Sequence, residues 1–141
     1  MTEAVIDSSI AITWCFEDEA TSETDALFER VRDEGAIVPD VWHLEIGNAL
    51  LQAEQRGRIS ANDVASRLSL IADLPISLDP ETAGRAWRDT LALARSERLT
   101  VYDAAYLELA VRRRLPLFTL DRDLASAAIR RGVVVLPASV A

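Results

Sequence analysis

Apolar residues along the chain follow two spacings, one typical of helices and one typical of short buried strands. Residues 41–55 have the clearest helical spacing. Their apolar side chains recur every three or four positions, at Trp42, Ile46, Ala49, Leu50 and Ala53. Shorter apolar runs such as residues 4–6 and 36–38 are bounded by polar residues, glycine or proline, as buried strands are. The chain therefore predicts a fold that contains both helices and strands.

Strand-like and helix-like segments alternate along the whole sequence. Strands are predicted at residues 4–6, 36–38, 75–78, 117–119 and 133–136. Helices are predicted at residues 9–16, 21–34, 41–55, 60–72, 80–98, 100–113 and 122–131. This order is typical of an α/β domain with a largely parallel sheet. Since neither an internal repeat nor a low-complexity linker interrupts it, we expect residues 1–141 to form a single domain.

Several predicted helix boundaries carry end signals. Ser60 and Asp63 resemble a capping box at the start of helix 60–72. Gly57 ends the helix before it. Asp79 and Pro80 provide an N-cap and a proline at the first helical position, so the helix that runs to residue 98 is expected to begin there.

The charge of the chain narrows the classes of function. The formal net charge is −8, and all 15 positive side chains are arginines. Because phosphate binding rests on contacts from basic side chains, a protein that holds nucleic acid mainly by a basic surface is disfavoured. Nucleic-acid chemistry on this chain needs another source of positive charge.

Features that the sequence lacks suggest where the protein works. Cys15 is the single cysteine, which excludes an internal disulfide and a cysteine-based zinc site within one chain; we interpret it as a small buried side chain. Residues 1–5 do not resemble a targeting leader, and no apolar run approaches the ~20 residues of a membrane span. We therefore expect a cytoplasmic protein without membrane contacts.

Four acidic residues occupy positions where an α/β sheet places its chemistry. Asp7 directly follows the first predicted strand, and Asp121 follows the strand around residues 117–119. In open parallel sheets, functional groups gather outside the carboxyl ends of the strands. Glu45 and Asp103 lie near the starts of helices that should cross beside those ends.

Each acid taken alone also has an ordinary structural explanation. Glu45 lies at the edge of an apolar helix face, where its carboxylate needs a metal ion, an arginine or water as a partner. Asp103 follows Thr100 at capping-box spacing. Asp121 and Asp7 each precede a predicted helix and are candidate N-caps. From their positions alone these alternatives remain open.

Taken together, the four carboxylates favour a shared cause. Carboxylates that converge at one sheet edge repel each other and raise each other's pKa unless a cation lies between them. Oxygen-rich sites of this kind suit Mg²⁺ or Mn²⁺. Such an ion activates water for phosphodiester cleavage and supplies the positive charge that the chain lacks. The sequence thus predicts a metal-dependent phosphodiesterase site.

Four segments in order resemble the signature blocks of the PIN-domain toxins of the VapC type, over nearly the whole chain. The segments are VIDSSIAITWCFEDE, VPDVWHLEIGNALLQAEQRGRIS, LTVYDAAYLELAVRRRLPLFTLDRDLASAA and GVVVLP. The resemblance implies that the acids at the family positions bind Mg²⁺ or Mn²⁺, namely Asp7, Glu45, Asp103 and Asp121. Asp123 falls where some members carry a further acid. Ser9 and Thr119 match hydroxyl positions that support the acids by hydrogen bonds.

The same resemblance carries expectations about fold and biology. It implies a three-layer α/β/α PIN-like domain with a central, mainly parallel sheet of four to five strands. It implies an endoribonuclease that hydrolyses RNA, usually as a homodimer, and a small VapB-like antitoxin whose C-terminal segment covers the active site. Two alternatives stay open: a PIN nuclease of RNA processing without a toxin role, and a catalytically silent domain that binds an antitoxin.

Other enzymes with acids at strand ends fit the chain less well. Response-regulator receivers and haloacid-dehalogenase phosphatases rely on a lysine near the transferred phosphoryl group, and the chain contains none. Ser8 and Ser9 after Asp7 also depart from the phosphatase Asp-x-Asp pattern. A P-loop enzyme is excluded because no Gly-x-x-x-x-Gly-Lys segment occurs.

Several conspicuous residues are interpreted as structural. His43, the single histidine, adjoins the predicted site, yet water activated by a metal needs no histidine base. The tryptophans have the spacing of core or interface aromatics, with base stacking as the lesser alternative; they are Trp14, Trp42 and Trp87. Three arginines at a helix C-terminus suit the helix dipole and are also candidate RNA contacts; they are Arg112, Arg113 and Arg114.

Overall fold

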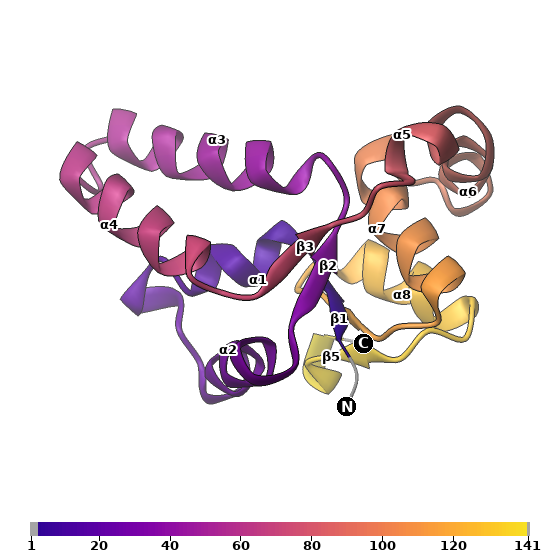
Figure 1. Ribbon diagram of the computed structural model, residues 1–141, viewed down its shortest axis with the longest axis horizontal. Helices are drawn as coiled ribbons and strands as arrows, with labels where there is room; N and C mark the ends of the chain where they lie inside the picture. Colours follow the sequence, from indigo (N-terminus) through magenta and orange to yellow (C-terminus); the bar gives the residue numbers. More distant parts are fainter. Residues whose placement is uncertain (1–2, 141) are drawn as a thin grey trace.

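A five-stranded parallel sheet forms the centre of the fold (Figure 1). The computed structural model describes residues 3–140. The strands are β1 (Ala4–Ile6), β2 (Ala36–Val38), β3 (Ile76–Leu78), β4 (Leu117–Phe118) and β5 (Val135–Leu136). Their order across the sheet is β3-β2-β1-β4-β5, and every neighbouring pair is parallel. The predicted α/β class with a parallel sheet is confirmed.

Helices cover both faces of this sheet. They are α1 (Ser8–Thr13), α2 (Ser22–Glu34), α3 (Trp42–Gln55), α4 (Ala61–Ala72), α5 (Thr82–Arg85), α6 (Leu91–Glu97), α7 (Val101–Arg113) and α8 (Arg122–Arg130). Figure 1 shows α1 to α4 on one side of the strands and α5 to α8 on the other. The three-layer α/β/α architecture implied by the resemblance is therefore present.

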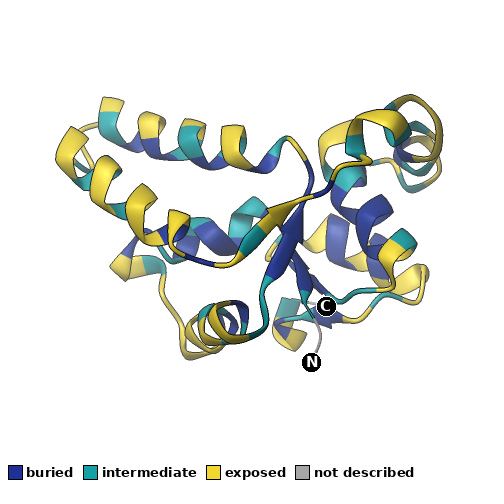
Figure 2. Ribbon diagram, viewed as in Figure 1, coloured by how far each residue is buried: buried dark blue, intermediate teal, exposed yellow. Residues whose placement is uncertain are grey.

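The central strands are apolar throughout because helices bury both of their faces. All three residues of β1 and of β2 are buried. In Figure 2 the buried positions run through the strands and the inward faces of the helices, while the outward helix faces are exposed. Val5, Ile6 and Phe118 are completely inaccessible to solvent. The edge strand β3 is more exposed than the strands inside the sheet.

Local sequence signals account for most helix ends. Ser60 and Asp63 form the predicted capping box at the start of α4, with each side chain bonded to the other's backbone N–H. Gly35 ends α2 with a φ of 83°, and a Cβ at this position would lie 3.2 Å from the Pro75 carbonyl oxygen. Both the positive φ and the close approach of the Pro75 backbone require glycine there.

Two predicted helices differ from the structure. The helix predicted at residues 9–16 ends at Thr13, and a separate 3-10 turn, η1 (Glu17–Glu19), follows. The helix predicted from residue 80 begins only at Thr82, because Asp79 folds the chain into a turn instead of capping a helix. Oδ1 of Asp79 accepts the Glu81 N–H at 3.3 Å, and its Oδ2 accepts the Thr82 hydroxyl at 2.8 Å. A π-helical segment, η2 (Ala86–Thr90), then separates α5 from α6.

The connections of the sheet define where a site belongs. From β1 the chain adds β2 and β3 on one side, then returns to the other side of β1 and adds β4 and β5. The strand order therefore reverses between β1 and β4. Ligand sites of open α/β sheets lie outside the carboxyl ends of the strands at such a reversal. Within residues 3–140, no helix is long and apolar enough to cross a bilayer.

Candidate active site

The two strands that flank the reversal point each end in an acid. Asp7 follows β1 and Asp121 follows β4 after two intervening residues. Ile6 and Phe118 are paired across the two strands, and the Asp7 N–H donates to the Phe118 carbonyl oxygen at 2.9 Å. Parallel pairing thus brings acids that are far apart in sequence to one edge of the sheet.

Hydroxyl groups fix the carboxylate of Asp7. Oδ2 of Asp7 accepts the Ser9 hydroxyl at 2.7 Å and the Thr119 hydroxyl at 2.8 Å. The same hydroxyls accept backbone N–H groups, Ser9 from Leu120 and Thr119 from Asp121, each at 3.0 Å. Burial raises the pKa of Asp7, the two hydroxyls lower it, and the charge of Asp121 raises it further. The hydroxyls therefore hold a buried acid in place and partly offset the cost of its ionised form.

Glu45, in the first turn of α3, has a protein partner that the sequence did not reveal. The hydroxyl of Tyr106, from α7, donates a hydrogen bond to Oε1 of Glu45. Tyr106 is completely buried, and Glu45 is half-buried. Burial raises the pKa of Glu45, the Tyr106 hydroxyl lowers it, and the charge of Asp7 raises it. The partner expected from sequence was a metal, an arginine or water; within the protein it is a neutral hydroxyl.

Asp103 lies in the first turn of α7, and the charges of the other three acids affect its pKa. Its pKa is raised to about 6, first by burial and then by the charges of Asp121, Asp7 and Glu45. Electrostatic effects of this kind act over short distances inside a protein. The four candidate carboxylates therefore share one neighbourhood, although they come from four separate segments of the chain.

The explanation of the acids as ordinary helix caps holds for Asp121 but not for Asp7 or Asp103. Thr100 caps α7 by accepting the Asp103 N–H at 3.1 Å, but the reciprocal bond from the Asp103 carboxylate is absent within the described chain. Asp7 makes no side-chain cap to α1. Asp121 is a true N-cap of α8, since its Oδ1 accepts the N–H groups of Asp123 and Leu124 at 2.9 and 3.1 Å. The exposed Asp123 contributes its backbone to that cap.

Hydrogen bonds anchor one oxygen of an acid and leave the other one available. The anchored atoms are Oδ2 of Asp7, Oε1 of Glu45 and Oδ1 of Asp121. Oδ1 of Asp7 receives a long contact of 3.5 Å from the Ser8 hydroxyl. Among residues 3–140, Oδ2 of Asp121 accepts no hydrogen bond, and the Ser8 hydroxyl is the other polar group beside the Glu45 carboxyl. An oriented carboxylate with one oxygen available is the form in which acids coordinate hard cations.

The donor set suits a hydrated ion better than a fully dehydrated one. In the part of the chain that the structure describes, no three His, Cys, Asp or Glu side chains form a preformed metal cage. Mg²⁺ dehydrates reluctantly and is usually held by one or two carboxylates, several waters and phosphate oxygens of the substrate. Anchored, mutually repelling carboxylates fit that requirement.

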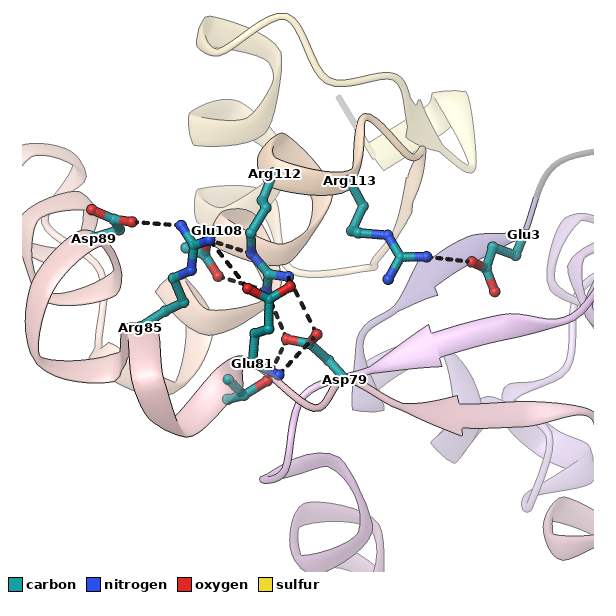
Figure 3. A network of polar contacts seen from close by, with 9 residues as sticks. Glu3, Asp79, Glu81, Arg85, Asp89, Glu108, Arg112 and Arg113 are labelled. Carbon is teal, nitrogen blue, oxygen red and sulfur yellow. Dashed lines mark hydrogen bonds and ion pairs between the residues drawn. The ribbon is translucent and has the colours of Figure 1, made fainter.

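The arginines predicted as candidate RNA contacts lie at the other end of α7 from Asp103, and two of them are engaged in ion pairs. Arg112 is 11% exposed and pairs with Asp79, Glu81 and Glu108 (Figure 3). Its Nη2 lies 2.6 Å from Oδ2 of Asp79, whose side chain is fully buried. Arg112 therefore joins α7 to the turn after β3, and these ion pairs account for its charge without an RNA contact.

Arg113 and Arg114 differ from Arg112 in exposure. Arg113 pairs with Glu3 at 3.1 Å on the surface, as Figure 3 also shows. Arg114 is the C-cap of α7, in the left-handed conformation with a φ of 55°. Since α7 rises ~1.5 Å per residue, these side chains start roughly 15 Å from Asp103 along the helix axis. Their placement favours a structural role at the helix C-terminus.

The histidine and tryptophans have distinct environments. His43 is exposed and lies edge-on to Trp42, with ring centroids 4.9 Å apart. Trp42 is buried, and Trp14 packs edge-on against Phe28. Trp87, in η2, is 90% exposed, so of the two structural interpretations, core or interface aromatic, the core one is wrong for this residue. His43 bonds to none of the four acids.

Sequence reasoning missed two residues that organise this region. Tyr106 lies three residues after Asp103 on the apolar face of α7, and its spacing alone could have placed it beside the acids. Asp79 follows β3 as Asp7 follows β1, but it pairs with Arg112 away from the four acids. Position after a strand therefore does not by itself distinguish a catalytic acid from a structural one.

Comparisons with known proteins agree with this fold. A family model described as the PIN domain matches residues 4–130. Ribonuclease VapC3 from Pyrobaculum aerophilum is 26% identical over 121 residues, which cover 86% of this chain and 91% of that protein. The crystal structure of PAE2754 from the same organism superposes with a TM-score of 0.71 at 21% identity, covering 99% of this chain and 93% of that one. The chain belongs to the PIN-domain family.

Proposed function

We propose that this protein is an endoribonuclease that hydrolyses RNA phosphodiester bonds with Mg²⁺ or Mn²⁺ bound by Asp7, Glu45, Asp103 and Asp121. The observation that carries the proposal is the geometry that gathers the acids: the Thr119 hydroxyl joins the Asp7 carboxylate to the Asp121 backbone. The pKa of Asp103, raised to about 6 by burial and by the charges of the other three acids, agrees with it. A cation between the carboxylates reduces their mutual repulsion, and their negative charges attract the cation. The similarity to Ribonuclease VapC3 supports RNA as the substrate.

The residues of the chain divide the work between binding and orientation. The bound ion supplies a Lewis acid for the scissile phosphate and lowers the pKa of water. Ser9 and Thr119 orient Asp7 through its Oδ2. Tyr106 orients Glu45 through its Oε1. Because each oriented acid keeps an oxygen outside these bonds, it can bind the ion without losing its support.

Cleavage of RNA in the presence and absence of metal tests the proposal. The purified chain, freed of any partner, is expected to cleave a single-stranded oligoribonucleotide in Mg²⁺ or Mn²⁺ and to stop in EDTA. Unchanged cleavage in EDTA would contradict the metal mechanism. The variant His43→Asn is the matched control, since His43 adjoins the site in sequence but bonds to none of the acids; it is expected to keep full activity.

The similarity to a VapC-type ribonuclease extends the proposal to a toxin with a small antitoxin as its partner and to a homodimer as its assembly. Expression of the chain alone is expected to arrest growth, and co-expression of the partner to restore it. The complex should co-purify. Harmless overexpression of a preparation that cleaves RNA in vitro would instead favour a nuclease of RNA processing. Sedimentation analysis of the isolated chain tests the homodimer.

A further inference from the structure

Tyr102 is an exposed aromatic residue in the first turn of α7, directly before Asp103. It is 62% exposed, whereas Tyr106 on the same helix is completely buried. Its hydroxyl takes part in no hydrogen bond within residues 3–140. Val101 beside it is 40% exposed. The packing of the fold therefore does not account for an aromatic side chain at this position.

Tyr102 lies on the same helix as two residues of the acidic site, Asp103 and Tyr106. Residues i and i+4 lie on the same face of a helix, so Tyr102 lies on the face that carries Tyr106. The hydroxyl of Tyr106 reaches Glu45. Tyr102 lies one turn, ~5.4 Å, nearer the N-terminus of α7, and helical side chains lean in that direction. Tyr102 is therefore a solvent-exposed ring one helical turn before the tyrosine that bonds to Glu45, and directly before Asp103 in the chain.

Apolar side chains also precede two other acids of the site. Leu44, before Glu45, is 75% exposed, and Leu120, before Asp121, is 37% exposed. The carboxylates thus have exposed apolar neighbours on three separate segments of the chain. A phosphodiester substrate presents a charged phosphate flanked by flat, weakly polar bases, which complements such an arrangement.

We propose that Tyr102 is a substrate-binding residue that stacks on an unpaired base next to the scissile phosphate. The inference rests on the proposed ribonuclease function and names a substrate-binding residue for it. A base in a duplex hides both faces in the stack, so only an unpaired base can lie on Tyr102. Stacking depends on the ring and not on the hydroxyl, since every base has a π-face.

The first test separates the ring from the hydroxyl. Tyr102→Ala is expected to raise KM for a single-stranded oligoribonucleotide by about 5- to 150-fold, as loss of one stacked base does, with a smaller change in kcat. Tyr102→Phe should behave as the unmodified protein. The control Trp87→Ala removes another exposed aromatic residue, which lies in η2 between the ion-paired residues Arg85 and Asp89. This variant should leave KM and kcat unchanged. Equal effects of Tyr102→Ala and Trp87→Ala would overturn the proposal.

The second test identifies the stacked base without relying on cleavage. Binding of a fluorescently labelled oligoribonucleotide is measured by anisotropy in an Asp121→Asn background, with Tyr102 intact or replaced by alanine. Abasic positions are then introduced one at a time. One abasic position should weaken binding to the protein with Tyr102 and have no further effect after Tyr102→Ala, which is the signature of a direct contact.

The outcomes separate this inference from the function on which it rests. If the unmodified protein does not cleave RNA, the proposed function fails, while the binding measurement still decides the stacking contact. Strictly additive effects at every abasic position would overturn the stacking contact even if cleavage is intact. Unchanged RNA binding by Tyr102→Ala together with weaker capture of a partner protein would also overturn it and would assign this surface to that protein.

Discussion

Oγ1 of Thr119 donates a hydrogen bond of 2.8 Å to Oδ2 of Asp7, a residue 112 positions away in the chain. The same hydroxyl oxygen accepts the backbone N–H of Asp121 at 3.0 Å. One buried side chain therefore connects the acid that follows β1 with the acid that follows β4. This connection spans the point where the strand order reverses, so it controls the relative position of two acids proposed to bind the metal.

Replacing Thr119 by valine tests this connection. Thr119→Val keeps the shape of the side chain and removes the hydroxyl, which leaves the Asp121 N–H without its partner and the Asp7 carboxylate with the Ser9 hydroxyl but not that of Thr119. We expect the free energy of unfolding to fall by about 1 to 3 kcal/mol, the cost of buried polar groups left unsatisfied. Cleavage should fall by about 10- to 100-fold, as for other residues that orient metal ligands. Urea denaturation and RNA cleavage measure the two effects.

The matched control for that change is Ser126→Ala. Ser126 is exposed on α8 and makes no side-chain hydrogen bond within the described chain. Its replacement should change the free energy of unfolding by no more than about 0.5 kcal/mol. A Thr119→Val protein as stable and as active as Ser126→Ala would show that the hydroxyl bridge does not organise the site.

Tyr106→Phe removes the bond to Glu45 and keeps the buried ring. The hydroxyl lowers the pKa of Glu45, so its loss leaves only the smaller effect of the Ser8 hydroxyl against the raising effects of burial and of the Asp7 charge. We expect weaker binding of Mg²⁺ and a loss of cleavage of about 10- to 100-fold, because Glu45 is no longer oriented. Calorimetric titration of the metal and kcat measure these effects. Tyr102→Phe, which removes an exposed hydroxyl, is the control; equal metal affinities in the two variants would contradict the role of Tyr106.

The buried ion pairs of Arg112 predict a dependence of stability on pH. Burial by itself raises the pKa of Asp79, but the bonds from Arg112, Thr82 and the Glu81 N–H outweigh it, so the pKa lies below its ordinary value. The stability contributed by the Asp79 carboxylate is therefore present above the pKa of the unfolded chain, about 3.9. It is lost as the pH falls through the lower pKa of the folded protein.

Two variants test this pair at pH 7 and pH 3. Arg112→Met leaves buried carboxylates without their cation and should lower the free energy of unfolding by about 3 to 5 kcal/mol at pH 7. Asp79→Asn should be destabilising at pH 7, and its deficit should narrow at pH 3. Arg113→Met breaks the surface pair with Glu3 and should cost no more than about 1 kcal/mol. Similar losses for Arg112→Met and Arg113→Met in urea denaturation would refute the distinction.

Local patterns were sufficient for elements whose boundaries depend on neighbouring residues. Strands β1 and β2 have the predicted limits, because each is a buried apolar triplet between residues that end a strand. The prediction of one continuous helix at residues 80–98 was wrong because the start of this segment depends on a residue distant in the sequence. Asp79 turns toward Arg112, 33 residues later, and that pairing is not encoded near residue 79. The π-helical register of Ala86–Thr90 likewise has no signal in the spacing of apolar residues.

The candidate site shows the same division between local and distant information. The positions of Asp7 and Asp121 after strands could be predicted, since parallel strands end at one edge of a sheet. The partner of Glu45 could not, because Tyr106 is 61 residues away and its hydroxyl reaches Glu45 only in the folded protein, where side chains of α3 and α7 meet beside the sheet. Arg112 was predicted as a candidate RNA contact for its charge, whereas its partners come from three separate positions after β3 and on α7.

The sharpest distinction between a metal site and ordinary helix caps comes from Asp103→Asn and Asp121→Asn. The pKa of Asp103 in the folded protein, about 6, lies above its ordinary value of 3.8. The folded state therefore binds this proton more tightly than the unfolded chain, and without metal the protein should lose stability as the pH rises from about 4 to about 6. Asp103→Asn removes the charge. It should be more stable than the unmodified protein at pH 7 without metal, by an amount on the order of 1 kcal/mol after solvent screening.

Asp121→Asn separates the cap from the metal in the same experiment. Oδ1 of Asp121 caps α8, and asparagine caps about as well, so stability without metal should change by no more than ~1 kcal/mol. In both variants the rise in melting temperature that Mg²⁺ produces should shrink, since stabilisation by a ligand follows its affinity for the folded state. RNA cleavage should fall by about 100-fold or more. Asp63→Asn, in the capping box of α4, should keep the full Mg²⁺ response and full activity. Retained cleavage with an unchanged Mg²⁺ response in both site variants would contradict the metal site, because the negative charge would then have no function at either position. Asp121 would be only a helix cap, and Asp103 would have no role in catalysis.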